Sequence, residues 1–135
     1  MKIIYVRNTP FPEDFVDGEE TNGVVFTRSF YTATDIVSDG RPAIVIADED
    51  VVSNHPSSEF AAVLKKYNPD ILFFLVSYRM SNDQHVDGTI GMSRGKSLAG
   101  QLISMLRAHE LMDAARALMD VARASVDENL ANLKL

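Results

Sequence analysis

The 135-residue chain contains no cysteine and no tryptophan, and it has only three histidines. The absence of cysteine excludes disulfides, thiolate metal ligands and thiol catalysis, and it is typical of proteins in the reducing cytoplasm. His55, His85 and His109 are 30 and 24 residues apart and have no pattern of carboxylates around them. No metal site is therefore expected, and nothing in the sequence calls for a cofactor.

Long apolar runs are also missing. No window approaches the roughly 20 apolar residues of a membrane span, and the apolar run at residues 3–6 is too short for a signal peptide. The net charge is −6, and residues 1–60 hold four basic and eleven acidic side chains. Membrane insertion and binding to nucleic acid through a broad basic face are not expected. We expect a cytoplasmic globular protein.

Short apolar runs, by contrast, are frequent. They occupy residues 3–6, 23–26, 43–47 and 71–76, with a weaker fifth run at 88–92. Continuous runs rich in β-branched residues are typical of strands buried on both faces of a parallel sheet. Capping and terminating residues predict helices over residues 32–38 and 57–67, so the order of elements predicts a doubly wound α/β fold with a five-stranded parallel sheet.

Two connections between these strands are poor helix candidates. Residues 7–22 contain Pro10, Pro12 and five carboxylates, and they offer at most two helical turns. Residues 79–87 are polar and rich in turn formers, so the helix expected there is short or absent.

The C-terminal third, by contrast, contains no glycine or proline from residue 101 onward. Methionines recur there every seven residues, with alanines three positions later, which is typical of a helical interface. A helix over residues 97–133 would be about 55 Å long, whereas a globule of this size is about 30–35 Å across. The helix must therefore project and pair with a second copy, or break near Ala108 and His109 and pack on its own domain. The predicted dimer seam comprises Met105, Ala108, Met112, Ala115, Met119, Ala122, Val126 and Leu133.

Two strand ends carry a resemblance to a known family. Residues 41–48 read Arg-Pro-Ala-Ile-Val-Ile-Ala-Asp and end on Asp48, and residues 72–77 read Leu-Phe-Phe-Leu-Val-Ser and end on Ser77. These segments resemble the third and fourth strands of the receiver domain of bacterial response regulators. The resemblance covers residues 1–107, leaves 108–135 as a helical extension for dimerisation, and implies a flavodoxin-like fold. It also implies that Asp48 is the phosphoryl acceptor and Ser77 the residue that senses the phosphoryl group.

The chain departs from the family after the first strand. Receivers carry two acidic residues there, which help the acceptor aspartate to hold Mg²⁺, whereas this chain has Arg7 and Asn8. A guanidinium places a fixed positive charge where the metal would lie. The lysine that the family carries after strand five has no counterpart either. We expect no magnesium and no conventional phosphorylation, with Arg7 paired instead to Asp48, Glu49 or Asp50.

The loop after the fifth run is a second candidate site. Residues 91–97 read Gly-Met-Ser-Arg-Gly-Lys-Ser, which resembles a phosphate-binding P-loop with one residue missing between the glycines. Nucleotide hydrolysis is not expected from this loop. Anion binding at the start of the following helix stays open. Its candidate residues are Ser93, Arg94, Gly95, Lys96 and Ser97.

The sequence therefore leaves two functions. The first is a non-catalytic, degenerate receiver that acts in signalling or scaffolding through contacts with an unidentified protein, is independent of phosphorylation and is homodimeric through its C-terminal helix. By the resemblance, residues 79–100 would form the partner-binding region. The alternative is a small-molecule, nucleotide or phosphate-binding α/β domain that uses the 91–97 loop. No enzyme activity is expected, because Ser77 has no visible base and no nucleophile elbow is present.

Overall fold

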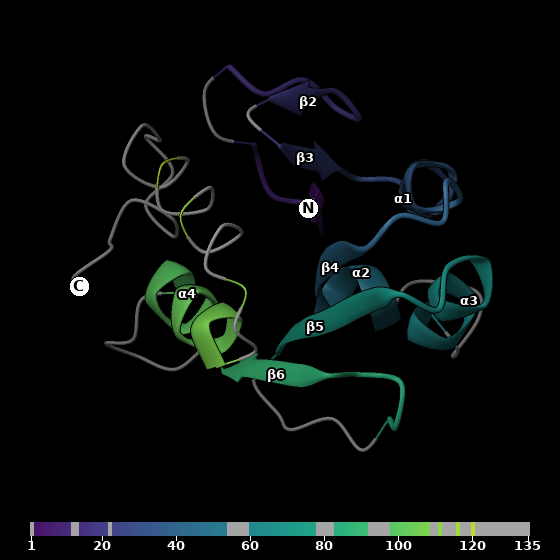
Figure 1. The fold of residues 1–135 in the computed structure, drawn as a ribbon. Helices are drawn as coiled ribbons and strands as arrows, with labels where there is room; N and C mark the ends of the chain where they lie inside the picture. The colour runs from purple at the N-terminus through teal and green to yellow at the C-terminus, as the bar shows by residue number, and fades with distance from the viewer. Residues whose placement is uncertain are drawn as a thin grey trace.

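A computed structural model of the chain describes residues 2–11, 14–21, 23–53, 60–77, 83–91 and 98–108, together with Leu111, Arg116 and Asp120. The protein is α/β, built on one six-stranded sheet (Figure 1). Its strands are β1 (Lys2–Val6), β2 (Glu20–Thr21), β3 (Val24–Thr27), β4 (Ala43–Asp48), β5 (Ile71–Ser77) and β6 (Gly88–Gly91).

The strands follow the order β2-β3-β1-β4-β5-β6 across the sheet. All neighbouring pairs are parallel except β2 and β3, which are antiparallel. The five predicted strands are confirmed, because β-branched and aromatic side chains cover both faces of the central ones. The predicted count of five is wrong by one, since the two-residue β2 adds an antiparallel edge.

Helices lie on both faces of this sheet. The helices α1 (Phe30–Val37), α2 (Glu49–Ser53) and α3 (Phe60–Tyr67) cover one face, and α4 (Leu98–Ala108) packs on the other (Figure 1). Alternate strand residues divide between the two cores, as the pleat requires. Ile4 and Val45 face α1 and α3, for example, whereas Ile3 and Ile44 share the α4 side.

The helices are specified by their ends. Ser29 caps α1 by accepting a hydrogen bond from the Thr32 N–H at 3.3 Å. After α1, Gly40 adopts a positive φ of 76°, which turns the chain towards β4. The predicted helix over 32–38 is thus confirmed. The helix predicted over 57–67 is confirmed from Phe60 to Tyr67, and residues 57–59 lie outside the described residues.

The first crossover contains no helix among its described residues. Two phenylalanines of this segment, Phe11 and Phe15, pack on the ring of Phe26 in β3 with centroids 5.8 and 4.7 Å away. These rings cover a part of the α4-facing side of the sheet that a crossover helix would otherwise bury. The prediction that residues 7–22 are a poor helix candidate is confirmed for the described part of this segment.

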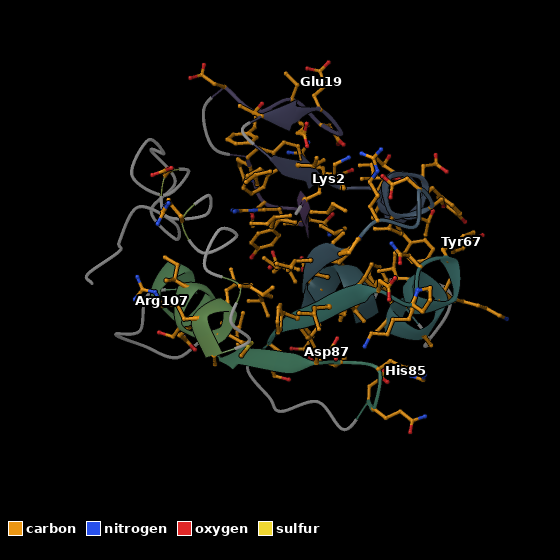
Figure 2. The ribbon with its side chains drawn as sticks, in the orientation of Figure 1. Lys2, Glu19, Tyr67, His85, Asp87 and Arg107 are labelled. Atoms are coloured by element: carbon orange, nitrogen blue, oxygen red, sulfur yellow. The ribbon has the colours of Figure 1, made fainter. Side chains whose placement is uncertain are left out.

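The second connection that is a poor helix candidate, residues 79–87, ends at Asp87, directly before β6 (Figure 2). Its carboxylate accepts a hydrogen bond from the Phe73 N–H at 2.8 Å and pairs with Lys65 Nζ at 2.7 Å. Residues 83–87 contain turns and no helix. The prediction of a short or absent helix is confirmed over this described part of 79–87. One carboxylate joins α3, β5 and β6.

The end of α4 bears on the predicted long helix. The last helical residue is Ala108, and the Leu111 N–H donates to the Leu106 carbonyl at 2.8 Å. A hydrogen bond from the N–H of residue i+5 to the carbonyl of residue i is typical of the Schellman motif that ends a helix. Leu111 also packs against the hydrophobic core. Leu111 is not helical, which agrees with the alternative of a broken helix, and residues 109 and 110 lie outside the described residues. No helix in the described part of the chain is both long and apolar enough to cross a bilayer.

Candidate functional site

The carboxyl edge of the parallel sheet is the first place to look for function. In open α/β sheets, ligands bind beyond the carboxyl ends of the strands. Here the edge carries Arg7 directly after β1, Thr27 at the end of β3, Asp48 at the end of β4 and Ser77 at the end of β5. Arg7, Thr27 and Ser77 are each at most 2% exposed. The side chains of Arg7, Thr27 and Ser77 are thus buried in the fold.

Arg7 is the largest of the buried side chains at this edge. Its Nε donates to Thr9 Oγ1 at 2.6 Å, and its Cζ lies 5.3 Å from the ring centroid of Tyr5 and 5.9 Å from that of Phe26. A guanidinium over aromatic faces is stabilised by the ring quadrupoles. Phe26 therefore contacts both this cation and the two phenylalanines of the first crossover.

The strand register relates Arg7 to Asp48. Val6 lies opposite Ala47 in the β1–β4 pair, and the Arg7 N–H continues the β1–β3 ladder by donating to the Thr27 carbonyl at 2.9 Å. One further step puts Arg7 opposite Asp48 on adjacent strands, about 4.8 Å apart. Both belong to the alternating set that faces α4.

Asp48 itself accepts a hydrogen bond from the Tyr5 hydroxyl at 2.7 Å. The Tyr5 ring is 1% exposed and stacks on Phe26, with centroids 5.7 Å apart. Because its ring is fixed in the core, Tyr5 holds the aspartate oxygen in one place. The predicted phosphoryl acceptor is thus already engaged by a neutral donor.

Ser77 lies on the opposite face of the sheet from Asp48. It shares its face with Leu75, two residues earlier, which belongs to the core beneath α1 and α3. Its hydroxyl donates to Glu49 Oε2 at 2.6 Å. Glu49 is in the first turn of α2, where the helix dipole favours a carboxylate. The predicted residues Asp48 and Ser77 therefore belong to two separate hydrogen-bonded pairs.

The other predicted residues have mixed outcomes. Asn8 is exposed, and Asp50 accepts from the Val51 N–H at 2.9 Å. The pairing of Arg7 with Asp48, Glu49 or Asp50 stays a prediction. The anion-binding candidates Ser93, Arg94, Gly95, Lys96 and Ser97 lie outside the described residues, whereas the Gly91 carbonyl accepts from Gln101 Nε2 at 2.8 Å.

Only two positions of the predicted dimer seam are described. Met105 is partly buried against the core, where a Cβ on Gly88 would lie 2.6 Å from its Sδ. Ala108 is exposed. The close approach at Gly88 shows that the first seam methionine packs on β6 of its own chain. The remaining seam positions, which lie outside the described residues, are Met112, Ala115, Met119, Ala122, Val126 and Leu133.

Sequence reasoning missed Tyr5, Thr9 and Phe26 as parts of this site. The apolar run at residues 3–6 predicts only a place in a buried strand for Tyr5. The signal that could have found it is its position: it precedes Arg7 by two residues, so both share a face, and Asp48 ends the strand predicted beside it. The sequence does not predict Glu49 as the partner of Ser77.

The chemistry available at this edge is limited. No group of three potential metal-ligating side chains occurs among the described residues. The serine hydroxyl donates to a carboxylate and the aspartate accepts from a tyrosine, so both are held by hydrogen bonds in the fold. The arrangement is suited to holding its own strands and helices in fixed positions.

Comparison with protein-family models, with curated proteins and with solved structures found no significant match for this chain.

Proposed function

We propose that the protein is a degenerate receiver domain with a flavodoxin-like, doubly wound fold that works in cytoplasmic signalling or scaffolding through protein contacts. The observation that carries this proposal is the buried guanidinium of Arg7, opposite Asp48 at the carboxyl edge. A fixed cation at that position replaces the charge that a divalent ion would bring, so the edge keeps its shape without a metal or a phosphoryl group.

The strand order supports the proposal. Taken without β2, the parallel strands follow the order β3-β1-β4-β5-β6, which is 2-1-3-4-5 in chain order. That order is one of the two common doubly wound arrangements and the one of flavodoxin-like folds. One departure is the first crossover, where Phe11 and Phe15 stand in place of a helix. Another is the crossover before β6, whose described residues 83–87 contain no helix.

The two hydrogen-bonded pairs also favour a role without phosphorylation. Tyr5 occupies an oxygen of Asp48, and Glu49 accepts from the Ser77 hydroxyl. Attack through Asp48 Oδ1 on a phosphodonor would have to break the first pair. Without a divalent ion, the charge that develops on the phosphoryl group would also lack its usual neutralisation.

The test is intact-mass spectrometry after incubation with acetyl phosphate and Mg²⁺. We expect the mass to remain unchanged, while a conventional receiver treated in parallel gains one phosphoryl group. Asp48→Asn should bind the same partners from a host lysate as the unchanged protein, since recognition would not depend on the acceptor. A phosphoryl group on Asp48 would contradict the proposal.

Homodimerisation through the C-terminal segment is a separate part of the proposal. It rests on the heptad spacing of the predicted seam, and a pair of adjacent positions tests it. We expect Met119→Lys to convert a dimer to a monomer in light scattering, because it places a charge on the seam. Asp120→Lys at the neighbouring exposed position is the matched control and should leave the mass unchanged. Equal masses for all three proteins would remove the dimer from the proposal.

A further inference from the structure

A cavity of about 570 Å³ opens at the amino edge of the sheet, the end opposite to the site described above. Its size lies within the range of about 300–1,000 Å³ that is usual for small-molecule sites. It is lined by Lys2, Glu20, Gly23, Ile36, Asp39, Arg41, Pro42 and Ala43.

Strand pairing brings these segments together. Lys2 lies opposite Ala43 in the β1–β4 register. The Ile3 N–H donates to the Gly23 carbonyl at 3.0 Å, which joins the start of β3 to the same edge. Lys2 and Ala43 belong to the face covered by α1, because each lies two residues before a residue of that face, Ile4 and Val45 respectively. Ile36, near the end of α1, lines the cavity on this side of the sheet.

The charges around the cavity are of both signs. Lys2 and Arg41 are cationic, whereas Glu20 and Asp39 are anionic, and none of the four forms an ion pair within 4.0 Å in the described part of the chain. Asp39 instead accepts from the backbone N–H of Arg41 at 2.9 Å, which fixes its carboxylate beside the loop. These charged groups are therefore available to a ligand.

The order of the charges along the edge is also defined. Glu20 lies on β2, Lys2 lies two strands away on β1, and Arg41 precedes β4 one strand further on. With neighbouring strands about 4.8 Å apart, β2 and β1 are separated by about 10 Å. The uncharged lining comes from Gly23 beside β3, Ile36 on α1, and Pro42 and Ala43 at the start of β4.

We propose that this cavity binds a short zwitterionic peptide with apolar side chains, its free ammonium towards Glu20 and its free carboxylate towards Lys2 and Arg41. A dipeptide or tripeptide spans about 7–10 Å when extended, which is comparable to the separation of about 10 Å between the strands that carry Glu20 and Lys2. An inorganic dianion such as phosphate fits less well, because Glu20 and Asp39 would repel it.

Titration of the full-length protein with leucyl-leucine, followed by the backbone amide signals of Lys2, Gly23, Ile36 and Ala43, tests the proposal. We expect saturable shifts at these positions. N-acetyl-leucyl-leucine, leucyl-leucine amide and glycyl-glycine each lack one recognised feature and should bind at least about tenfold more weakly, which corresponds to about 1.4 kcal/mol. No shifts with leucyl-leucine, or equal binding of the capped peptides, would overturn the proposal.

A pair of arginine variants maps the site. Arg41→Gln should weaken leucyl-leucine binding, whereas Arg28→Gln should not, because Arg28 is an exposed arginine directly after β3 at the opposite edge. Unchanged binding by Arg41→Gln would place the peptide elsewhere and contradict the proposal. The outcome is independent of the receiver hypothesis, which concerns the carboxyl edge.

Discussion

Arg7 at the carboxyl edge of the sheet and Arg41 at the amino edge lie in opposite environments. At the carboxyl edge, Arg7 is 2% exposed and its guanidinium packs on Tyr5 and Phe26, so the place where α/β sheets usually bind ligands is filled by the protein's own side chains. At the amino edge, Lys2 and Arg41 border an open cavity. The carboxyl ends of the strands are therefore where polar groups collect, but the burial of each group decides whether it can contact a ligand.

The largest effect is expected from Arg7→Ala. Loss of the packing on two rings, of the Thr9 hydrogen bond and of the side-chain volume should lower the free energy of unfolding by about 2–4 kcal/mol. Urea unfolding measures it. Arg28→Ala is the control, because the exposed Arg28 also lies over an aromatic ring, that of Phe11 at 4.5 Å, and should cost less than about 1 kcal/mol. Equal losses would mean that burial of Arg7 contributes nothing.

Tyr5→Phe is expected to have the next largest effect. It keeps the ring in the core but removes the donor to Asp48, a hydrogen bond to a carboxylate of 2.7 Å. The expected loss is about 1.5 kcal/mol by urea unfolding. An unchanged midpoint would show that Asp48 is equally well satisfied without the hydroxyl.

Ser77→Ala should cost somewhat less, about 1 kcal/mol. The variant removes the donor to Glu49, but Glu49 is partly exposed in the first turn of α2 and can turn to water. Glu49→Gln keeps an acceptor and is the matched variant. If Glu49→Gln destabilised the protein more than Ser77→Ala, the carboxylate would serve chiefly another partner.

The smallest change is expected at the amino edge. Arg41→Gln should alter the free energy of unfolding by less than about 0.5 kcal/mol, because the exposed side chain forms no ion pair in the described part of the chain. Thermal unfolding at low and high salt checks it. A loss as large as that of Arg7→Ala would erase the difference between the two edges.

The strands could be predicted because their burial on both faces leaves continuous apolar runs, as in residues 71–76. The helix α2 was missed because five residues are too few for a helical period, and β2 because two polar residues carry no strand pattern. Both elements depend on tertiary neighbours, α2 on the core under Val51 and β2 on its pairing with β3.

The candidate site was only partly predictable for a related reason. The position of Arg7 after a strand was visible in the sequence, but its burial depends on Phe26, whose ring is brought beside it only by the strand order. The amino-edge cavity could not be predicted at all, since its lining comes from several segments between residues 2 and 43 that meet through pairing.

The most direct test of the central claim, that an internal guanidinium replaces a divalent ion at the carboxyl edge, is titration of the full-length protein with Mg²⁺ at millimolar concentration while the amide signals of Arg7, Asp48 and Ser77 are followed. We expect these signals to stay in place. Saturable shifts confined to the three residues would contradict the account, because they would show a metal bound at the edge that Arg7 is argued to fill.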